Sequence, residues 1–258
     1  MTDEIRLTQP IRAERGVVWS ALSTAAGLMG WQADEVHGEP EAGEHVELAW
    51  PLLGVTLGLD VVERVEGRRL VFEAGPTRLC LALVPGGLEL VHSGVGEGDE
   101  RAGVTSSWVL SLGILAHFCE THPGARRSVR WLLAPAKTSA EAAHVFFTEP
   151  AALRAWLGEG DGIGSAGSRY AVEMGGGEHM SGHVLANSLG RDVAVSWDED
   201  EESVLVLRTL PRPLSPDQRL VVMSWSRWSR NAPPAHRAAR LEAAHHHLVR
   251  ALHMRSEA

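Results

Sequence analysis

An internal repeat constrains the fold of this chain more strongly than any other feature of its sequence. The segment LSTAAGLMGW, residues 22–31, aligns without gaps on FTEPAALRAW, residues 147–156. In this alignment Trp31 falls on Trp156, which lies 125 residues further along the 258-residue chain. A repeat that spans half of a chain predicts two similar domains, because each copy must bury its own apolar face.

Two later matches follow in the same order. The peptides AGEHVELAW and AGSRYAVEM align at an offset of 124 residues, and GRRLVFE at Gly67 aligns with GRDVAVSW at Gly190 at an offset of 123. Each match is weak alone, but their shared order supports the repeat. The segment THPGARRSV, residues 121–129, interrupts the periodicity of both copies. We therefore expect one domain over residues 1–125 and a second over residues 126–258.

Each copy shows the same order of secondary-structure signals, which predicts the α+β class. In the first copy Val46, Leu48 and Trp50 alternate with other residues, which is the period of a strand with one covered face. Each copy closes on a longer amphipathic segment, residues 104–120 and 235–255. We expect each domain to start with a strand and a helix, to continue through about six antiparallel strands, and to pack this sheet on its long C-terminal helix.

Composition limits the partners and the location of the chain. Its formal net charge of −9 disfavours binding to the phosphate backbone of nucleic acids. The two cysteines, Cys80 and Cys119, lack the spacing of a zinc or redox motif and fit a reducing cytoplasm. The N-terminus lacks the apolar region of a secretory signal, and the most apolar stretch, residues 48–62, is too interrupted to cross a membrane. No nucleic-acid or membrane partner is expected.

Three motifs of the first copy carry a family likeness. They are the ALSTAAGLMGW segment, the LELVHSGVGEGDE segment that follows a hairpin, and the Trp-initiated helix SSWVLSLGILAHF. Together they resemble the START-like superfamily, also called SRPBCC, and within it the domain homologous to the activator of the heat-shock protein 90 ATPase. Residues 5–120 resemble one copy of this domain. Residues 129–255 resemble a second, with FTEPAALRAWL and VAVSWDEDEESVLVLRT in the expected places.

The resemblance implies a helix-grip fold, also called Bet v 1-like, in which a curved antiparallel sheet wraps a long C-terminal helix and leaves a cavity between them. Members of the superfamily bind lipids, sterols, polyketides or hormones, and some act as cyclases or bind a chaperone. The second copy departs from the family pattern, because residues 223–226, MSWS, stand where an HSGF segment is usual. A ligand site in the second copy is therefore less secure than its fold.

Strand parity and the implied fold select the candidate ligand-binding residues. They are Trp50, Phe72, Leu81, His92 and Trp108 in the first copy and Trp197 and Trp225 in the second. Indoles and aliphatic side chains with few polar groups are typical of a site for a small apolar molecule. We expect Trp31 and Trp156 to be structural, because each follows a Leu by three residues on a short helix.

Few residues point to chemistry. His92 is expected to face the cavity, where its imidazole would anchor a polar ligand group, act as a general base, or form only a core hydrogen bond. The consecutive histidines at 245–247 point about 100° apart on a helix and do not converge on a metal ion. The acidic run at 198–202 is expected to be a solvated hairpin tip, or else a docking patch for a basic partner. We expect no cofactor, no metal and no catalytic residue.

Three functions remain open from the sequence. The first is a non-enzymatic protein that holds a small hydrophobic molecule in a helix-grip cavity. The second is a protein-interaction or co-chaperone-like regulatory module, which an exposed apolar patch would favour. The third is a cyclase or hydrolase, which would need paired titratable groups inside the cavity, and the sequence offers only His92.

Overall fold

The computed structural model describes residues 4–256 except 176, 213, 216 and 233. The chain divides into two compact units, residues 1–128 and 129–258. Each unit is an α+β domain with a seven-stranded antiparallel sheet and a long C-terminal helix. The division lies three residues after the boundary expected at residue 125.

The first unit begins with a strand and two helices and ends with its longest helix. In chain order its elements are β1 (Glu4–Pro10), α1 (Arg15–Ser23), α2 (Ala25–Trp31), β2 (Glu35–His37), β3 (His45–Trp50), the short 3-10 helix η1 (Pro51–Leu53), β4 (Val55–Val65), β5 (Arg69–Ala74), β6 (Thr77–Val84), β7 (Gly87–Ser93) and α3 (Gly98–Thr121).

The second unit repeats this order of strands and α-helices, but its 3-10 helix lies between β12 and β13. Its elements are β8 (Ser128–Ala136), α4 (Ala140–Thr148), α5 (Pro150–Leu153), β9 (Gly158–Gly160), β10 (Arg169–Met174), β11 (Glu178–Ser188), β12 (Asp192–Trp197), the 3-10 helix η2 (Asp198–Asp200), β13 (Ser203–Pro211), β14 (Arg219–Arg227) and α6 (Ala235–Ser256).

The two sheets have the same strand order. It is β1-β7-β6-β5-β4-β3-β2 in the first unit and β8-β14-β13-β12-β11-β10-β9 in the second. The register of β4 on β5 shifts between Val61 and Glu63, and that of β11 on β12 shifts between Val184 and Ala186. A bulge at the same step bends both strands, because an extra residue increases the local twist.

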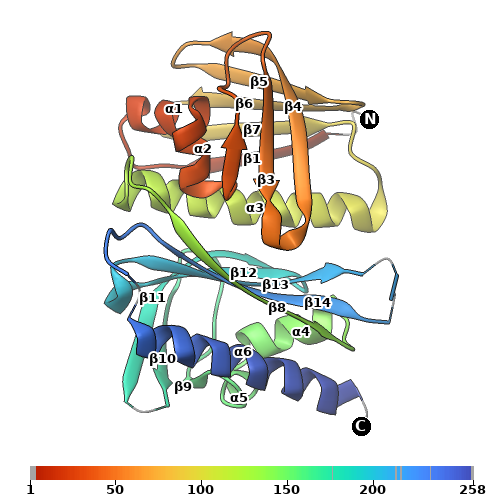
Figure 1. The fold of residues 1–258 in the computed structure, drawn as a ribbon, viewed down its shortest axis with the longest axis vertical. Coiled ribbons are helices and arrows are strands. Elements are labelled where there is room, and N and C mark those ends of the chain that lie inside the picture. The colour runs from red at the N-terminus through yellow and green to blue at the C-terminus, as the bar shows by residue number, and fades with distance from the viewer. Residues whose placement is uncertain (1–3, 176, 213, 216, 233, 257–258) are drawn as a thin grey trace. The chain divides into compact units, whose positions relative to one another are not determined.

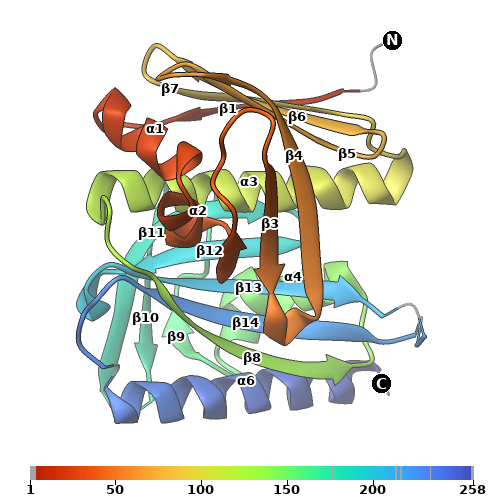
Figure 2. The ribbon, with the colours of Figure 1, turned by 45° about the horizontal axis from the view of Figure 1, so that its top comes forward.

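The long helix of each unit runs along one face of its own sheet (Figure 1). In the first unit the strands β1, β7 and β6 pass over α3, and the β3–β4 hairpin turns down beside it (Figure 2). Gly30 of α2 allows a close approach to α3, since a Cβ built there would lie 2.3 Å from Cζ of Phe118. This arrangement is a helix-grip fold in both units.

Alternating strand residues supply the core, as the sequence predicts. In β3 Val46 and Leu48 are buried, and in β7 Leu88 and Leu90 are buried on the face toward α3. The second core contains buried side chains from its strands and from α6, among them Leu241, Leu248 and Leu252. Burial of alternate aliphatic side chains stabilises each sheet on its helix.

Helix α3 is long and apolar enough to cross a membrane by length and composition alone. Residues 104–120 of this helix are the segment that the sequence predicts as the long C-terminal helix of the first copy. In the fold 56% of its most apolar window is buried, which is typical of a helix that packs in a protein core.

Trp31 and Trp156 occupy equivalent positions, each near the end of the helical segment that follows the first helix of its unit. Their side chains are 2% and 4% exposed. Nε1 of Trp31 donates to the carbonyl oxygen of Ala21, and Nε1 of Trp156 donates to that of Phe146, at 3.0 and 2.8 Å. Each indole thus bonds to a carbonyl ten residues upstream, which ties the short helix to the one before it.

Candidate functional site

The first unit contains an apolar cavity of about 250 Å³ between its sheet and its helices. Side chains from α2, from five neighbouring strands and from α3 line it. Four of the five candidates in the first unit are among the lining residues: Phe72, Leu81, His92 and Trp108. Their contact with a ligand stays a prediction.

Trp50, the fifth candidate, is not among the described residues that line this cavity. It is the last residue of β3 and is half-buried, directly before Pro51 ends the strand. Its Nε1 donates to the carbonyl oxygen of Gln32 at 3.0 Å. Trp50 therefore contacts the cavity wall through the backbone of Gln32, a residue that does line it.

Sequence reasoning missed nine lining residues: Leu28, Trp31, Gln32, Leu48, Leu57, Leu59, Ala74, Thr77 and Leu79. Parity alone could have found most of the strand residues among them. Leu57 and Leu59 share a face of β4, and Ala74 shares the face of Phe72 on β5. No comparable signal marks Gln32, because a single polar residue after a helix is common in any sequence.

His92 reaches the cavity because β7 alternates, with Leu88 and Leu90 on the same face. Nε1 of Trp108 on α3 donates to Nδ1 of His92 at 2.9 Å, and the two rings meet edge to face at a centroid distance of 6.0 Å. Burial lowers the pKa of His92 below its ordinary value. The imidazole is therefore neutral at physiological pH, with its proton on Nε2.

Gln32 follows α2, and the backbone around it is held on both sides. Nη1 and Nη2 of Arg127 donate to the carbonyl oxygens of Trp31 and Ala33 at 2.8 and 2.7 Å. Trp50 holds the carbonyl of Gln32 itself. The side-chain oxygen Oε1 of Gln32 is buried and has no hydrogen-bond partner among the described residues. A buried hydrogen-bond acceptor without a partner costs free energy, so an atom such as Oε1 of Gln32 is rare in a folded protein.

The wall of the cavity offers much apolar surface and few reactive groups. Among the described residues that line it, His92 is the only titratable side chain. A general acid and base pair needs two such groups within reach of a substrate. Elsewhere in the described chain no group of three or more His, Cys, Asp or Glu residues could hold a metal ion.

Two positions that border the cavity in the first unit carry tryptophan in the second. In β5 the residue at the end of the strand is Ala74, and in β12 it is Trp197. Along one cross-strand row, Phe72, Leu79 and His92 pair in the first sheet. In the second sheet the row is Val195, Leu205 and Trp225, so Trp225 stands where the first unit has His92.

Trp197 and Trp225 lie in the packed core of the second unit. Their ring centroids are 6.2 Å apart, with the planes tilted by 37°. Nε1 of Trp225 donates to Oδ2 of Asp200 and to Oγ of Ser203, both at 3.0 Å. Nε1 of Trp197 donates to the carbonyl oxygen of His179 at 3.3 Å. The structure gives these indoles a packing role, and their place in a ligand site stays a prediction.

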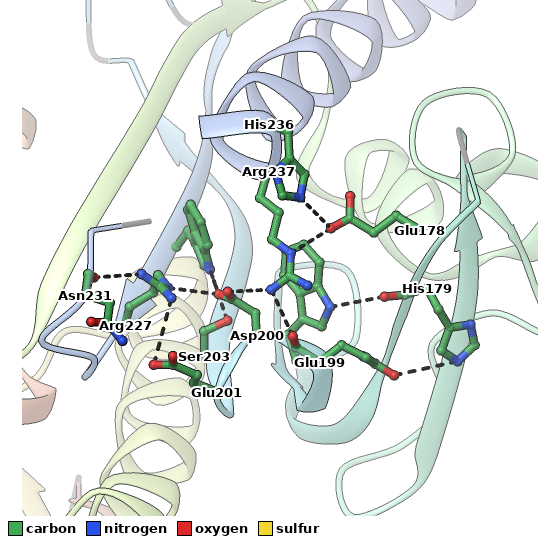
Figure 3. Close-up of polar contacts among 12 residues, drawn as sticks. Glu178, His179, Glu199, Asp200, Glu201, Ser203, Arg227, Asn231, His236 and Arg237 are labelled. Carbon is green, nitrogen blue, oxygen red and sulfur yellow. Dashed lines mark hydrogen bonds and ion pairs between the residues drawn. The ribbon is translucent and has the colours of Figure 1, made fainter. Parts of the chain in front are cut away.

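An ionic cluster covers these two indoles (Figure 3). Oδ2 of Asp200 accepts from Nε of Arg227 at 3.0 Å, and Oδ1 accepts from Nη1 of Arg237 at 2.7 Å. Arg237 also donates through Nε to Oε1 of Glu178 at 2.7 Å. The two guanidinium groups lie over the rings of Trp225 and Trp197, at 5.4 and 5.0 Å from the centroids. Such stacking adds cation–π attraction to the ion pairs.

This cluster corrects the expectation that residues 198–202 form a solvated tip. Asp200 is 1% exposed, although its neighbours in η2 are more accessible. A carboxylate can be buried only when paired, and Asp200 has two guanidinium partners. The acidic run therefore supplies a buried ionic contact to α6 and β14 in addition to exposed charge.

No family model and no curated protein matches the chain. Similar solved structures include DynU16, a protein in the dynemicin biosynthetic locus, at 16% identity and a TM-score of 0.42, with 98% of this chain and 97% of that chain covered. The Aha1 dimer from Colwellia psychrerythraea is similar at 18% identity and a TM-score of 0.40, over 46% of this chain and 96% of that one.

A third similar structure is the protein SSP2350 from Staphylococcus saprophyticus. It shares 15% identity at a TM-score of 0.39, with 45% of this chain and 90% of that chain covered. The helix-grip fold of the present chain rests on its own strand order and on the packing of its own helices.

Proposed function

We propose that the first unit binds a small hydrophobic molecule in its cavity and does not convert it. One observation carries this proposal: an open space of about 250 Å³ lies where the second unit places indole side chains. Protein interiors are normally packed to the density of organic crystals, so a space of this size requires a reason. An apolar lining with a few polar groups is typical of ligand sites.

The size of the cavity limits the ligand and its affinity. A water molecule takes about 30 Å³ in the liquid and an aromatic carbon takes less, so the cavity accepts a molecule of on the order of ten to fifteen non-hydrogen atoms. Burial of ten methylene-sized groups contributes about 8 kcal/mol before the cost of association. Hydrophobic burial alone therefore gives an affinity no tighter than about micromolar.

We further propose that the two units are tandem copies of a START-like (SRPBCC) domain of the type homologous to the activator of the heat-shock protein 90 ATPase. The support is the sequence motifs described above and the identical strand order of the two sheets. A cytoplasmic location is part of this proposal, and the free thiols of Cys80 and Cys119 fit it.

The test of ligand binding is a variant that closes the cavity. Ala74→Trp places in the first unit the residue that the second unit carries at the same position. The matched control is Ala82→Trp, because Ala82 lies on the opposite face of the neighbouring strand β6. N-phenyl-1-naphthylamine, a neutral dye that fluoresces in apolar surroundings, is titrated into all three proteins, and native mass spectrometry is used to detect a retained molecule.

We expect saturable dye binding to the wild type and to Ala82→Trp, and at least a tenfold loss for Ala74→Trp. Equal dye binding by Ala74→Trp and the wild type would place the dye outside the cavity. No saturable binding to the wild type, together with no retained mass, would remove the support for a ligand-binding function.

A protein-interaction role is the second candidate, and an exposed apolar patch favours it. Leu52, Val55 and Leu57, at the tip of the β3–β4 hairpin, are 64%, 45% and 41% exposed. Clustered apolar side chains on a surface are typical of contact sites. Leu57 also lines the cavity, so the patch adjoins the ligand site.

The two functions predict different effects of Leu52→Ser. Leu52 is exposed and is not among the described residues that line the cavity. A binding-only protein would keep its dye affinity and its behaviour in pull-down experiments. Loss of a partner from pull-downs, with unchanged dye affinity, would favour the interaction role.

A further inference from the structure

Three polar side chains line the cavity of the first unit, and two of them have an atom left for a ligand. The hydroxyl of Thr77 donates to the carbonyl oxygen of Ala74 at 2.8 Å, so its proton is committed. Among the described residues, the hydrogen bond of His92 is the one that its Nδ1 accepts from Trp108. Gln32 has a buried Oε1 that no described residue contacts by a hydrogen bond. These two residues determine which polar groups a bound molecule needs.

His92 offers a hydrogen-bond donor. Because Nδ1 accepts the indole N–H of Trp108, the proton of the neutral ring must lie on Nε2. The edge-to-face contact of the two rings fixes the orientation of the imidazole. Nε2–H therefore suits an acceptor on the ligand, such as a carbonyl or ether oxygen.

Gln32 offers a hydrogen-bond acceptor from another part of the wall. It follows α2 and its carbonyl oxygen accepts from Trp50 of β3, whereas His92 is on β7, four strands away in the sheet order. The flanking carbonyl groups are held by Arg127, which fixes the backbone on both sides of Gln32. Its Oε1 suits a donor on the ligand, such as a hydroxyl group.

The second unit shows that the fold does not need either polar group. Alignment at the offset of 125 places Leu157 at the position of Gln32, and Leu157 is buried in the second core. The strand register places Trp225 at the position of His92. Both polar side chains thus belong to the unit with the cavity, and both are replaced where indoles fill the core.

The cavity is also unsuited to a charged ligand. Among the described lining residues there is no Lys, Arg, Asp or Glu. An ionised carboxylate or ammonium group would lose its hydration there without gaining a counter-ion. The wall therefore selects against free fatty acids and amines and for uncharged molecules.

We infer that the ligand of the first unit is a neutral, mainly apolar molecule with an oxygen acceptor toward one end, which binds Nε2–H of His92, and a hydroxyl donor toward the other, which binds Oε1 of Gln32. This inference rests on the proposed ligand-binding function, and it narrows the ligand class. Hydroxyketones of on the order of ten to fifteen non-hydrogen atoms fit the volume and the polarity.

A matched series of naphthalenes tests the inference. 6-Hydroxy-2-acetonaphthone carries both groups, 2-acetonaphthone lacks the donor, 2-ethylnaphthalene lacks both, and 6-hydroxy-2-naphthoate is charged. Their affinities are measured by displacement of N-phenyl-1-naphthylamine. A neutral hydrogen bond contributes a factor of roughly three to ten, so we expect the hydroxyketone to bind at least tenfold more tightly than 2-ethylnaphthalene. The naphthoate should bind more weakly than either ketone.

Two variants assign the groups to their partners. In Gln32→Leu, a substitution that the second unit already carries at its Leu157, the hydroxyketone should fall to the affinity of 2-acetonaphthone, which itself should not change. In His92→Phe both ketones should weaken threefold to tenfold, while 2-ethylnaphthalene should not. Gln9→Leu on β1, outside the described lining of the cavity, is the control for a general effect.

The outcomes separate this inference from the function on which it rests. Equal binding of all three neutral probes would overturn the inference and leave a simple apolar site. Binding of the naphthoate as tight as that of the hydroxyketone would overturn the selection for neutral molecules. No binding of any probe would overturn the proposed function and the inference together. If either variant fails to fold, the ranking of the four probes on the wild type still decides the question.

Discussion

Where β5 of the first unit ends in Ala74, β12 of the second ends in Trp197, and where β7 carries His92, β14 carries Trp225. The strand order and the bulge are the same in the two units. One unit leaves about 250 Å³ open in front of its long helix, while the other places two indoles in contact. Two inward positions of the same sheet therefore differ between the unit with the cavity and the unit whose core contains the paired indoles.

The units also differ at the hairpin that borders these positions. In the first unit β5 and β6 are joined by a short turn, with Ala74 opposite Thr77. In the second unit η2 lies between β12 and β13 and supplies Asp200, which binds Arg227 and Arg237. The longer hairpin covers its indoles with charge, whereas the first unit has Gly75 and Pro76 at the corresponding place. The two units therefore differ in this turn as well as in the volume of their inward side chains.

The largest expected effect comes from removing the carboxylate at the centre of the ionic cluster. Asp200→Ala leaves the guanidinium groups of Arg227 and Arg237 without their buried partner, and Trp225 keeps only Ser203 as an acceptor. Loss of one member of a buried ion pair typically costs about 3–5 kcal/mol. We expect the second unit to lose that much stability, measured by urea unfolding and located by hydrogen exchange.

The control for this prediction is Glu242→Ala, which removes the partner of Arg130 from an exposed pair in the same unit. Exposed ion pairs contribute about 0–1 kcal/mol, so little change is expected. If Asp200→Ala lowers the free energy of unfolding no more than Glu242→Ala does, the ionic cluster does not stabilise the second unit.

Trp197→Ala should destabilise the second unit by about 3–5 kcal/mol, because it deletes a fully buried indole and leaves a cavity. It also converts the second unit toward the first, since Ala then stands at the position of Ala74. We expect the variant to gain a second dye site in the N-phenyl-1-naphthylamine titration. A large loss of stability with no added site would show that the core collapses around the deletion.

Much of this comparison could be predicted from the sequence, because it depends on periodicity. The alignment of Trp31 with Trp156 is matched by equivalent indole hydrogen bonds to Ala21 and Phe146. Alternation found the inward faces of Phe72, Leu81 and His92. Periodicity depends on local backbone geometry, and a sequence displays it directly.

The sequence did not reveal that the first unit contains a cavity while two indoles pack in the core of the second. Whether a core is filled depends on the sum of side-chain volumes in space, and Trp197 and Trp225 share the same parity whether they line a cavity or fill one. Sequence alignment also did not show that His92 and Trp225 are equivalent. The element η2 lengthens the second hairpin, so the offset of 123 residues no longer holds after β12. Burial of Asp200 depends on Arg237, a residue of α6 that no local pattern connects with it.

Trp31→Ala and Trp156→Ala compare the stability of the two units at a pair of equivalent tryptophans. Trp156 packs into the core of the second unit, whereas Trp31 borders the open cavity. A side chain that faces empty space has fewer packing contacts to lose. We expect Trp156→Ala to cost about 3–5 kcal/mol and Trp31→Ala about 1 kcal/mol less, from urea midpoints. Equal losses would indicate that the cavity is closed in solution.

The smallest expected effect is a dependence of stability on pH, which His92 causes in the first unit. Burial lowers the pKa of His92 in the folded state, so the unfolded chain takes up a proton first as the pH falls below about 6.5. The stability contributed by neutral His92 is therefore complete above that pH and declines as the pH falls from there toward the folded pKa. His245 of the second unit behaves in the same direction, because burial lowers its pKa as well.

Protonation also changes the chemistry of the cavity, because imidazolium carries a proton on Nδ1, which then faces the indole N–H of Trp108. Two donors cannot bond to each other, so the His92 ring should shift and ligand affinity should fall in step with the stability of the first unit. We expect dye affinity to be constant from pH 8 to pH 7 and to decrease only at pH values below the ordinary histidine pKa of about 6.5. In His92→Phe this decrease should disappear, while the acid sensitivity of the second unit, followed by hydrogen exchange around His245, should remain. An unchanged acid decrease in His92→Phe would assign it to another group and would leave His92 without a role in binding.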